Sequence, residues 1–301
     1  QSAFYGKPVD CTVEPALKEG LCHIPRRPAR MDVDRHVERV ELNLLGIEPG
    51  DTIKFVPTDK GHNSASVVIP EGAEAWDGTM RLVDRVDWSS LVRRPRPVIG
   101  FSDNTVLHLA LQRLGIVSFH GPHPAVEEFP PFSADLLRRL LTSTHPAGRL
   151  PFPCAGGRAE TLVPGVAEGP LVGGNLVLLA ATIGTRCALR SEGAILFLEE
   201  VGEATYRLDR LLTQLRLSGA LQGLRGVVVG ALSECPDEDS TETPSLRELV
   251  MDRLGDLGVP VARGFPFGHQ ADNWTLPLGV RAKLDATAGT LDLLEPAVAP
   301  R

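Results

Sequence analysis

The stretch AILFLEEVGEATYRLDRLLTQLRLSG, residues 194–219, decides the fold class. It begins with a continuous apolar run, AILFL (194–198), which is typical of a strand buried on both faces of a parallel sheet. A second run of this kind, GVVVGAL, follows at 226–232. Strand, helix and strand in this order predict an α/β fold with helices packed on mostly parallel strands. The helix is predicted from leucines that recur at helical spacing, namely Leu208, Leu211, Leu212 and Leu215.

The residues before this stretch predict a second α/β part. RPVIG (96–100) predicts a strand that enters a turn, and apolar residues at helical spacing predict a helix over 104–114. The stretch at 145–157, HPAGRLPFPCAGG, is rich in Pro and Gly and is the best domain boundary. We therefore expect an N-terminal α/β part, residues 1–145, and a C-terminal α/β domain, residues 158–301, with the active site at their interface. Further helices are expected at 33–45, 133–141, 175–183 and 245–254, and a hairpin at 283–295.

Composition narrows the classes of partner and compartment. The net charge of −7 argues against a surface built for nucleic-acid phosphates. No stretch approaches the roughly 18 consecutive apolar residues of a membrane span. The start, QSAFYGKPVDC (1–11), lacks the basic head and apolar run of a secretory signal. The five cysteines form no CxxC and their odd number suits a reducing compartment, so we expect a cytoplasmic protein.

GFSDN (100–104) places Ser102 where the predicted strand turns into the predicted helix. A serine there projects from a tight turn, and the backbone N–H groups that follow it point at the group it attacks. The main-chain N–H of Asp103 could supply an oxyanion donor. A Ser-Asp pair is also an ordinary helix N-cap. From these residues alone, the nucleophile and the cap both stay open.

Two later segments carry residues that could assist such a serine. Glu199 and Glu200 directly follow the run AILFL, and ligand sites in open α/β sheets lie beyond the carboxyl ends of the strands. His269 lies in GFPFGHQADN (264–273), whose glycines allow close approach to a partner. A carboxylate that orients a histidine, which takes the proton of a serine, is the logic of a catalytic triad. Taken singly, the glutamates could equally lie in a solvated loop and the histidine on the surface.

Several motifs together resemble the L,D-carboxypeptidase (muramoyl-tetrapeptide carboxypeptidase) family from about residue 78 to residue 295. The resemblance implies a Ser-Glu-His peptidase that removes the terminal D-alanine from the murein tetrapeptide, with Ser102 as nucleophile and His269 as base. The motifs, in the family's order and spacing, are GFSDNTVLHLAL (100–111), FHGP (119–122), GGNL (173–176), ILFLEEVGEATYRLDRLLTQL (195–215), PVARGFPFGH (260–269) and TLPLG (275–279).

The resemblance leaves three candidates for the catalytic glutamate. We align it with Glu199, the residue right after the apolar strand, and take Glu200 as the second choice. Glu203 fits a structural role at the start of the next helix. In the implied mechanism, Glu199 orients His269 and stabilises its cation.

The oxyanion site is where this chain departs from the family. Family members carry a glycine-rich GG(Y/W)G loop that contributes the second oxyanion donor, whereas residues 75–84 here are AWDGTMRLVD. Only Gly78 matches. We expect the Asp103 amide, together with that of Gly78, to stabilise the oxyanion, and Asn175 of the GGNL motif to contribute to oxyanion or substrate binding. No metal or organic cofactor is needed.

Residues 46–76 resemble the N-terminal half of pseudoazurin, a blue-copper protein, so the chain looks chimeric and residues 1–75 are atypical. In that family the histidine matching His62 binds copper with a Cys, a His and a Met further on. After His62 no cysteine appears until Cys154, and no methionine follows that cysteine at ligand spacing, so we expect no copper site. GIEPGDTIKFV (46–56) could act as the missing first strand.

The predicted function is therefore that of a serine carboxypeptidase acting on a small peptide, the murein tetrapeptide, in peptidoglycan recycling. We expect a homodimer that binds neither nucleic acid nor a membrane. A microcin C-type immunity peptidase is the alternative, since a relative of the family cleaves such peptide-nucleotide antibiotics. A catalytically dead binding protein is another, should the altered N-terminal third spoil the oxyanion hole. An electron-carrying cupredoxin would need the missing copper ligands.

Overall fold

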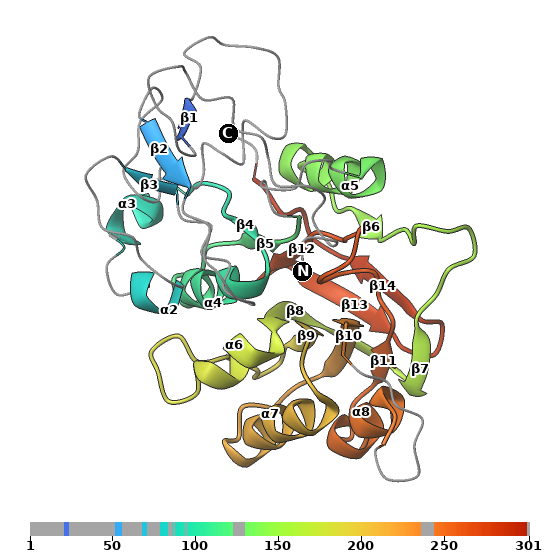
Figure 1. Cartoon of the computed structure of the whole chain (residues 1–301). Coiled ribbons are helices and arrows are strands. Elements are labelled where there is room, and N and C mark those ends of the chain that lie inside the picture. Colours follow the sequence, from blue (N-terminus) through green and yellow to red (C-terminus); the bar gives the residue numbers. More distant parts are fainter. Residues whose placement is uncertain are drawn as a thin grey trace.

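The predicted α/β class is confirmed by the computed structural model, in which helices pack around three β-sheets (Figure 1). Every helix that the structure describes is too short or too polar to span a bilayer. The described residues are 21–23, 52–55, 68–70, 79–83, 86, 88–93, 95–122, 130–235 and 244–299.

The largest sheet has eight strands in the order β6-β14-β13-β8-β9-β10-β11-β7. Its four central strands, β8, β9, β10 and β11, pair in parallel, because helices connect them in succession. The strands are β6 (Gly148–Arg149), β7 (Glu160–Val163), β8 (Val166–Asn175), β9 (Ile195–Val201), β10 (Gly226–Ser233), β11 (Val261–Arg263), β13 (Arg281–Asp285) and β14 (Thr290–Leu293).

The expectation of mostly parallel pairing is wrong for the flanks of this sheet. The pairs β6–β14, β14–β13, β13–β8 and β11–β7 are all antiparallel. The hairpin predicted over 283–295 is present as β13 and β14, and its short turn permits only antiparallel pairing. The sheet is therefore mixed, with a parallel centre and antiparallel wings.

Strand β9 divides the core because successive side chains point to opposite faces of a sheet. Leu196 and Leu198 face a cluster formed with α6 (Leu176–Ala181), α7 (Thr205–Leu217) and α8 (Leu246–Leu254). Ile195 and Phe197 face a second cluster that includes residues of β12, β13 and α5. In Figure 1 the helices α6, α7 and α8 line one side of the large sheet.

A smaller sheet joins the two halves of the chain. Its order is β12-β5-β4, with β5 parallel to β4 and antiparallel to β12. The proposed division at 145–157 stays a prediction, although strands from either side of that segment share this sheet. The bounds are β4 (Ile99–Gly100), β5 (Ser118–His120), β12 (Leu276–Leu278), α2 (Thr79–Leu82), α3 (Trp88–Arg93), η1 (Ser102–Asn104), α4 (Thr105–Arg113) and α5 (Pro131–Thr142).

A third, antiparallel sheet lies in the N-terminal third of the sequence. It consists of β1 (Leu21–His23), β2 (Thr52–Phe55) and β3 (Val68–Pro70). Within GIEPGDTIKFV, the described residues Thr52–Phe55 thus form a strand, but one that pairs within this separate sheet. The helix expected over 33–45 and His62 lie outside the described residues, and the resemblance of 46–76 to pseudoazurin stays a prediction.

Strands β7 and β8 are not among the predicted strands, and the sequence of β8, VAEGPLVGGN, is rich in Gly. The glycines of β8 are required by a neighbouring strand rather than by a turn. A Cβ on Gly173, whose φ is +143°, would lie 1.8 Å from the carbonyl oxygen of Phe197 in β9. Close backbone approach can therefore make a central strand resemble a loop in sequence.

The replacement Gly173→Ala should destabilise the fold by about 4 kcal/mol or more, because the added methyl group collides with backbone that cannot move independently of the sheet. Gly184→Ala is the matched control, since Gly184 also has a positive φ, +80°, but open space around it. The control should lose only about 1–2 kcal/mol. Urea unfolding measures both, and equal losses would contradict the steric explanation.

Candidate active site

Ser102 lies at the turn between β4 and the helical segment η1–α4, as the sequence predicts. Its φ of +58° falls in the left-handed region, which costs a residue with a side chain about 1–3 kcal/mol. The alternative that Ser102 caps helix α4 is wrong, because Asn104 occupies the N-cap position and Ser102 is the first residue of η1. A strained serine between a strand and a helix is the geometry of a nucleophile elbow.

Buried His108 fixes the end of β4 just before this turn. Its Nε2 lies 2.8 Å from the carbonyl oxygen of Gly100 and its Nδ1 lies 2.9 Å from Oγ of Ser118. Burial lowers the pKa of His108 to about 3, against the opposing effect of the Gly100 carbonyl. His108 is therefore neutral at physiological pH, with Nε2–H as donor and Nδ1 as acceptor.

The segment that follows Gly78 is attached directly to the Ser102 turn. The amide of Thr79 donates to Oδ2 of Asp103 at 2.6 Å, and the Thr79 hydroxyl donates to the Asp103 carbonyl. Gly78 itself lies outside the described residues, so its oxyanion role stays a prediction. The two hydrogen bonds nevertheless connect Thr79, which follows Gly78 in the sequence, to Asp103, which follows Ser102.

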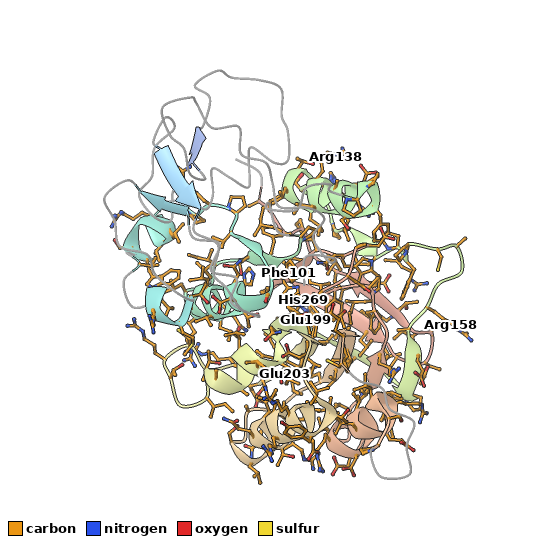
Figure 2. The ribbon with its side chains drawn as sticks, in the orientation of Figure 1. Phe101, Arg138, Arg158, Glu199, Glu203 and His269 are labelled. Atoms are coloured by element: carbon orange, nitrogen blue, oxygen red, sulfur yellow. The ribbon has the colours of Figure 1, made fainter. Side chains whose placement is uncertain are left out.

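Glu199 and His269 are in direct contact. Oε2 of Glu199 lies 2.7 Å from Nδ1 of His269, and both residues are buried. The ring of Phe101, the residue before Ser102, stands edge-on to the His269 ring with centroids 4.8 Å apart. Figure 2 shows Phe101, His269 and Glu199 next to one another at the centre of the molecule. The expected hydrogen bond between Ser102 and His269 stays a prediction.

Gly268 makes the contact between Glu199 and His269 possible. Its φ is +103°, and a Cβ there would lie 2.7 Å from both Cβ and Oε2 of Glu199. Any larger residue at position 268 would push the Glu199 carboxylate away from the imidazole of His269, the next residue in the sequence. Gly268 is thus one of the loop glycines that the sequence predicts to allow close approach, and in the structure it lets the loop approach Glu199.

The buried carboxyl of Glu199 is held in its ionised form. Burial alone would raise its pKa, but the electrostatic interaction with His269, together with the His269 hydrogen bond and the nearby His120 imidazole, outweighs burial and lowers the pKa to about 2. Nε2 of His120 lies 3.8 Å from Oε1, too far for a hydrogen bond, so in this geometry His120 acts through its charge distribution. An ionised carboxylate on Nδ1 leaves Nε2 of His269 as the proton acceptor.

The geometry distinguishes Glu199 from the other two candidate glutamates. Glu200 points to the opposite face of β9, where its carboxyl accepts from Nδ2 of Asn175 and from the amides of Val177 and Val201. Glu203 pairs instead with Arg207 on α7, and Figure 2 shows it further from His269. Glu199 belongs to β9 itself rather than to the loop after it.

Asn175 lies at the N-terminus of α6. Its Oδ1 accepts from the amide of Leu178, its Nδ2 donates to Glu200, and its own amide donates to Oγ1 of Thr105 on α4. These bonds tie the end of β8 to the helix that follows Ser102. A contact between Asn175 and a substrate stays a prediction.

His120 is the residue of this site that sequence reasoning left without a role. It belongs to the FHGP motif, is fully buried and faces Glu199. The sequence feature that could have identified His120 is its position at the end of a short strand that pairs with RPVIG. The carboxyl ends of parallel strands meet at one edge of a sheet, so His120 and the Ser102 turn are brought to the same edge.

Two family models match the chain. The LD-carboxypeptidase N-terminal domain matches residues 75–121, which include Ser102, and the LD-carboxypeptidase C-terminal domain matches residues 168–284, which include Glu199 and His269. The chain therefore belongs to the LD-carboxypeptidase family, a group of peptidases.

Its relatives include proteins named for two activities. A murein tetrapeptide carboxypeptidase of Pseudomonas aeruginosa is 35% identical over 219 residues, 69% of each chain. The crystal structure of a muramoyltetrapeptide carboxypeptidase from Oxalobacter formigenes is 32% identical, with a TM-score of 0.64 over 74% of this chain and 75% of that one. The microcin C7 self-immunity protein MccF of Escherichia coli is 25% identical over 247 residues, 73% of this chain and 71% of its own.

Glu200 should make stability fall as pH rises. Burial, followed by the neighbouring charge of Glu199, raises the pKa of its carboxyl from 4.5 to about 7. Between these values the folded state keeps a proton that the unfolded state has lost, so the free energy of unfolding decreases with pH by up to about 3 kcal/mol. Glu200→Gln should remove this decrease. Urea unfolding from pH 4 to pH 8 measures it, with exposed Glu168→Gln as the control, and an unchanged slope in Glu200→Gln would contradict the argument.

Proposed function

We propose that this chain is a serine carboxypeptidase that releases a terminal D-amino acid from the murein tetrapeptide, as a homodimer in the cytoplasm. The observation that carries the proposal is the buried Glu199–His269 pair beside the strained Ser102 turn. The names of the relatives from Pseudomonas aeruginosa and Oxalobacter formigenes supply the substrate class.

In the proposed mechanism, Oγ of Ser102 attacks the carbonyl carbon of the peptide bond that precedes the terminal D-amino acid. His269 takes the serine proton on Nε2, since Nδ1 is bound to Glu199. The C–N bond of the tetrahedral intermediate then breaks, and His269 gives the proton to the departing amine. Water enters, loses a proton to His269 and hydrolyses the acyl-serine ester, which restores the Ser102 hydroxyl.

The oxyanion of the tetrahedral intermediate needs donors that are oriented before the reaction. We assign this role to the amide of Asp103, together with that of Gly78. The support is the pair of hydrogen bonds from Thr79 to Asp103, which hold the two segments together. Chemistry at this site uses the chain's own side chains and amides, and the proposal assigns no metal or organic cofactor to it.

Replacing the nucleophile tests the mechanism. Ser102→Ala should lower kcat for D-alanine release by roughly 10⁴–10⁶, because the triad acts as a unit. The change removes a single hydroxyl group, so thermal melting should shift by the equivalent of only about 1 kcal/mol. Release of D-alanine and thermal melting are measured on both proteins. Equal turnover by the parent and Ser102→Ala would end the carboxypeptidase proposal.

The similarity to MccF supports a second substrate class, a peptide linked to a nucleotide. MccF structures have been solved in complex with aspartyl sulfamoyl adenosine, so this compound and the murein tetrapeptide form a decisive panel. We expect at least about tenfold higher kcat/KM for the tetrapeptide, since the relatives with higher identity carry that activity in their names. The reverse preference would favour the immunity function. A serine-directed fluorophosphonate that fails to label Ser102 would instead favour an inactive binding protein.

A further inference from the structure

His120 lies where the two halves of the site meet. It is the last residue of β5, where its backbone is in register with Gly100 of β4 and with Leu276 of β12. Strand β4 leads to Ser102, and β12 follows the loop that carries His269. The His120 side chain is fully buried on the face of β9 that carries Glu199.

The polar atoms around this imidazole are unusual for a buried site. Within the part of the chain that the structure describes, neither ring nitrogen of His120 has a hydrogen-bond partner, and Oε1 of Glu199 has none either. A buried polar atom without a partner destabilises the folded state, because its lost hydrogen bonds to water are not replaced. A histidine retained only for packing would have its nitrogens satisfied, as those of His108 are.

The unpaired atoms lie close enough to satisfy one another. Nε2 of His120 and Oε1 of Glu199 are 3.8 Å apart, so a movement of about 1 Å would bring them to hydrogen-bond distance. A bridging water would hold them roughly 4.5 Å apart, which is more than the gap allows. The other carboxylate oxygen is already committed to His269.

The surroundings of His120 are largely aromatic. The rings of Phe101, Phe197 and Phe267 stand edge-on to it, with centroids 6.1, 5.2 and 6.2 Å away. These phenylalanine rings carry no polar atom that could bond to the ring nitrogens of His120. The single negative charge of Glu199 is, moreover, already shared with His269.

We propose that His120 is a positioning residue, whose Nε2–H donates to Oε1 of Glu199 in the working site and so keeps Oε2 on His269. The carboxylate is then held between two imidazoles and cannot rotate away when His269 becomes charged. This inference rests on the proposed function of Glu199 and His269. It adds a residue that would not touch the substrate and would act through Glu199.

Two substitutions separate the hydrogen bond from the packing. His120→Phe keeps an aromatic ring among phenylalanines but has no donor, whereas the side-chain amide of His120→Gln keeps a donor near the position of Nε2. We expect kcat for D-alanine release to fall about 10–100-fold in His120→Phe with KM within about twofold. In His120→Gln most of that loss should be recovered. Equal kcat in the Phe variant and the parent would overturn the proposal.

The pH profile gives a readout that loss of packing would not change. Among the described residues, the titratable groups next to His120 are Glu199 from β9 and His108 from α4, and Glu199 in turn binds His269 from the loop before β12. Without the donor, the charge of the carboxylate concentrates on Oε2 and holds the His269 proton more tightly. The acid limb of kcat/KM should therefore move to higher pH in His120→Phe and stay in place in His120→Gln.

Phe197→Leu is the matched packing control, since Phe197 is fully buried and contacts the His120 ring without any polar atom. It should lower the melting temperature and leave the acid limb unchanged. A shift of the acid limb equal to that of His120→Phe would attribute the effect to packing and overturn the proposal.

Nitrogen-15 NMR of histidine-labelled protein tests the hydrogen bond without substrate. We expect His120 as the neutral Nε2–H tautomer, with a proton resonance that moves in Glu199→Gln. A ring protonated on Nδ1 alone, or on both nitrogens, would overturn the proposal whatever the activity. An Nε2–H tautomer in a protein that releases no D-alanine would leave this bond standing and contradict the proposed function instead.

Discussion

Burial of one ionised carboxylate is the constraint around which the centre of this protein is arranged. Glu199 is fully buried, and an isolated charge there would be prohibitively costly. Its partner His269 comes from a loop 70 positions further along the chain, and His120 comes from the small sheet. Segments from both sheets must therefore meet at this point for the charge to be compensated.

Glycines allow the backbones to approach as closely as this packing requires. Gly268 lets its loop lie against the side chain of Glu199, and Gly173 lets β8 lie against the carbonyl of Phe197 two residues earlier on β9. Gly230 of β10 leaves room for the ring of Phe267, next to Gly268. Gly268 thus leaves room for the carboxylate itself, while Gly173 and Gly230 leave room for Phe197 and Phe267, which precede Glu199 and His269 in the sequence.

Elements with a clear period could be predicted from the sequence. The strand at 226–232, the helix at 206–219 and the hairpin at 283–295 are all present, because burial on a sheet or along one helix face leaves a regular apolar pattern. Strand β8 could not be predicted, since its glycines are required by close contacts with residues that are distant in sequence. Apart from that hairpin, the antiparallel pairs β11–β7 and β13–β8 also depend on pairings that no local pattern specifies.

The sequence by itself determined the α/β class, the order of the main elements and a short set of candidate residues, including Ser102, Glu199 and His269. Only the tertiary structure decided which glutamate meets the histidine. Neighbours on a strand point to opposite faces, so Glu199 faces His269 while Glu200 faces Asn175. Which face meets which partner depends on how distant segments pack. For the same reason only the structure shows that, among the described residues, the ring nitrogens of His120 have no hydrogen-bond partner.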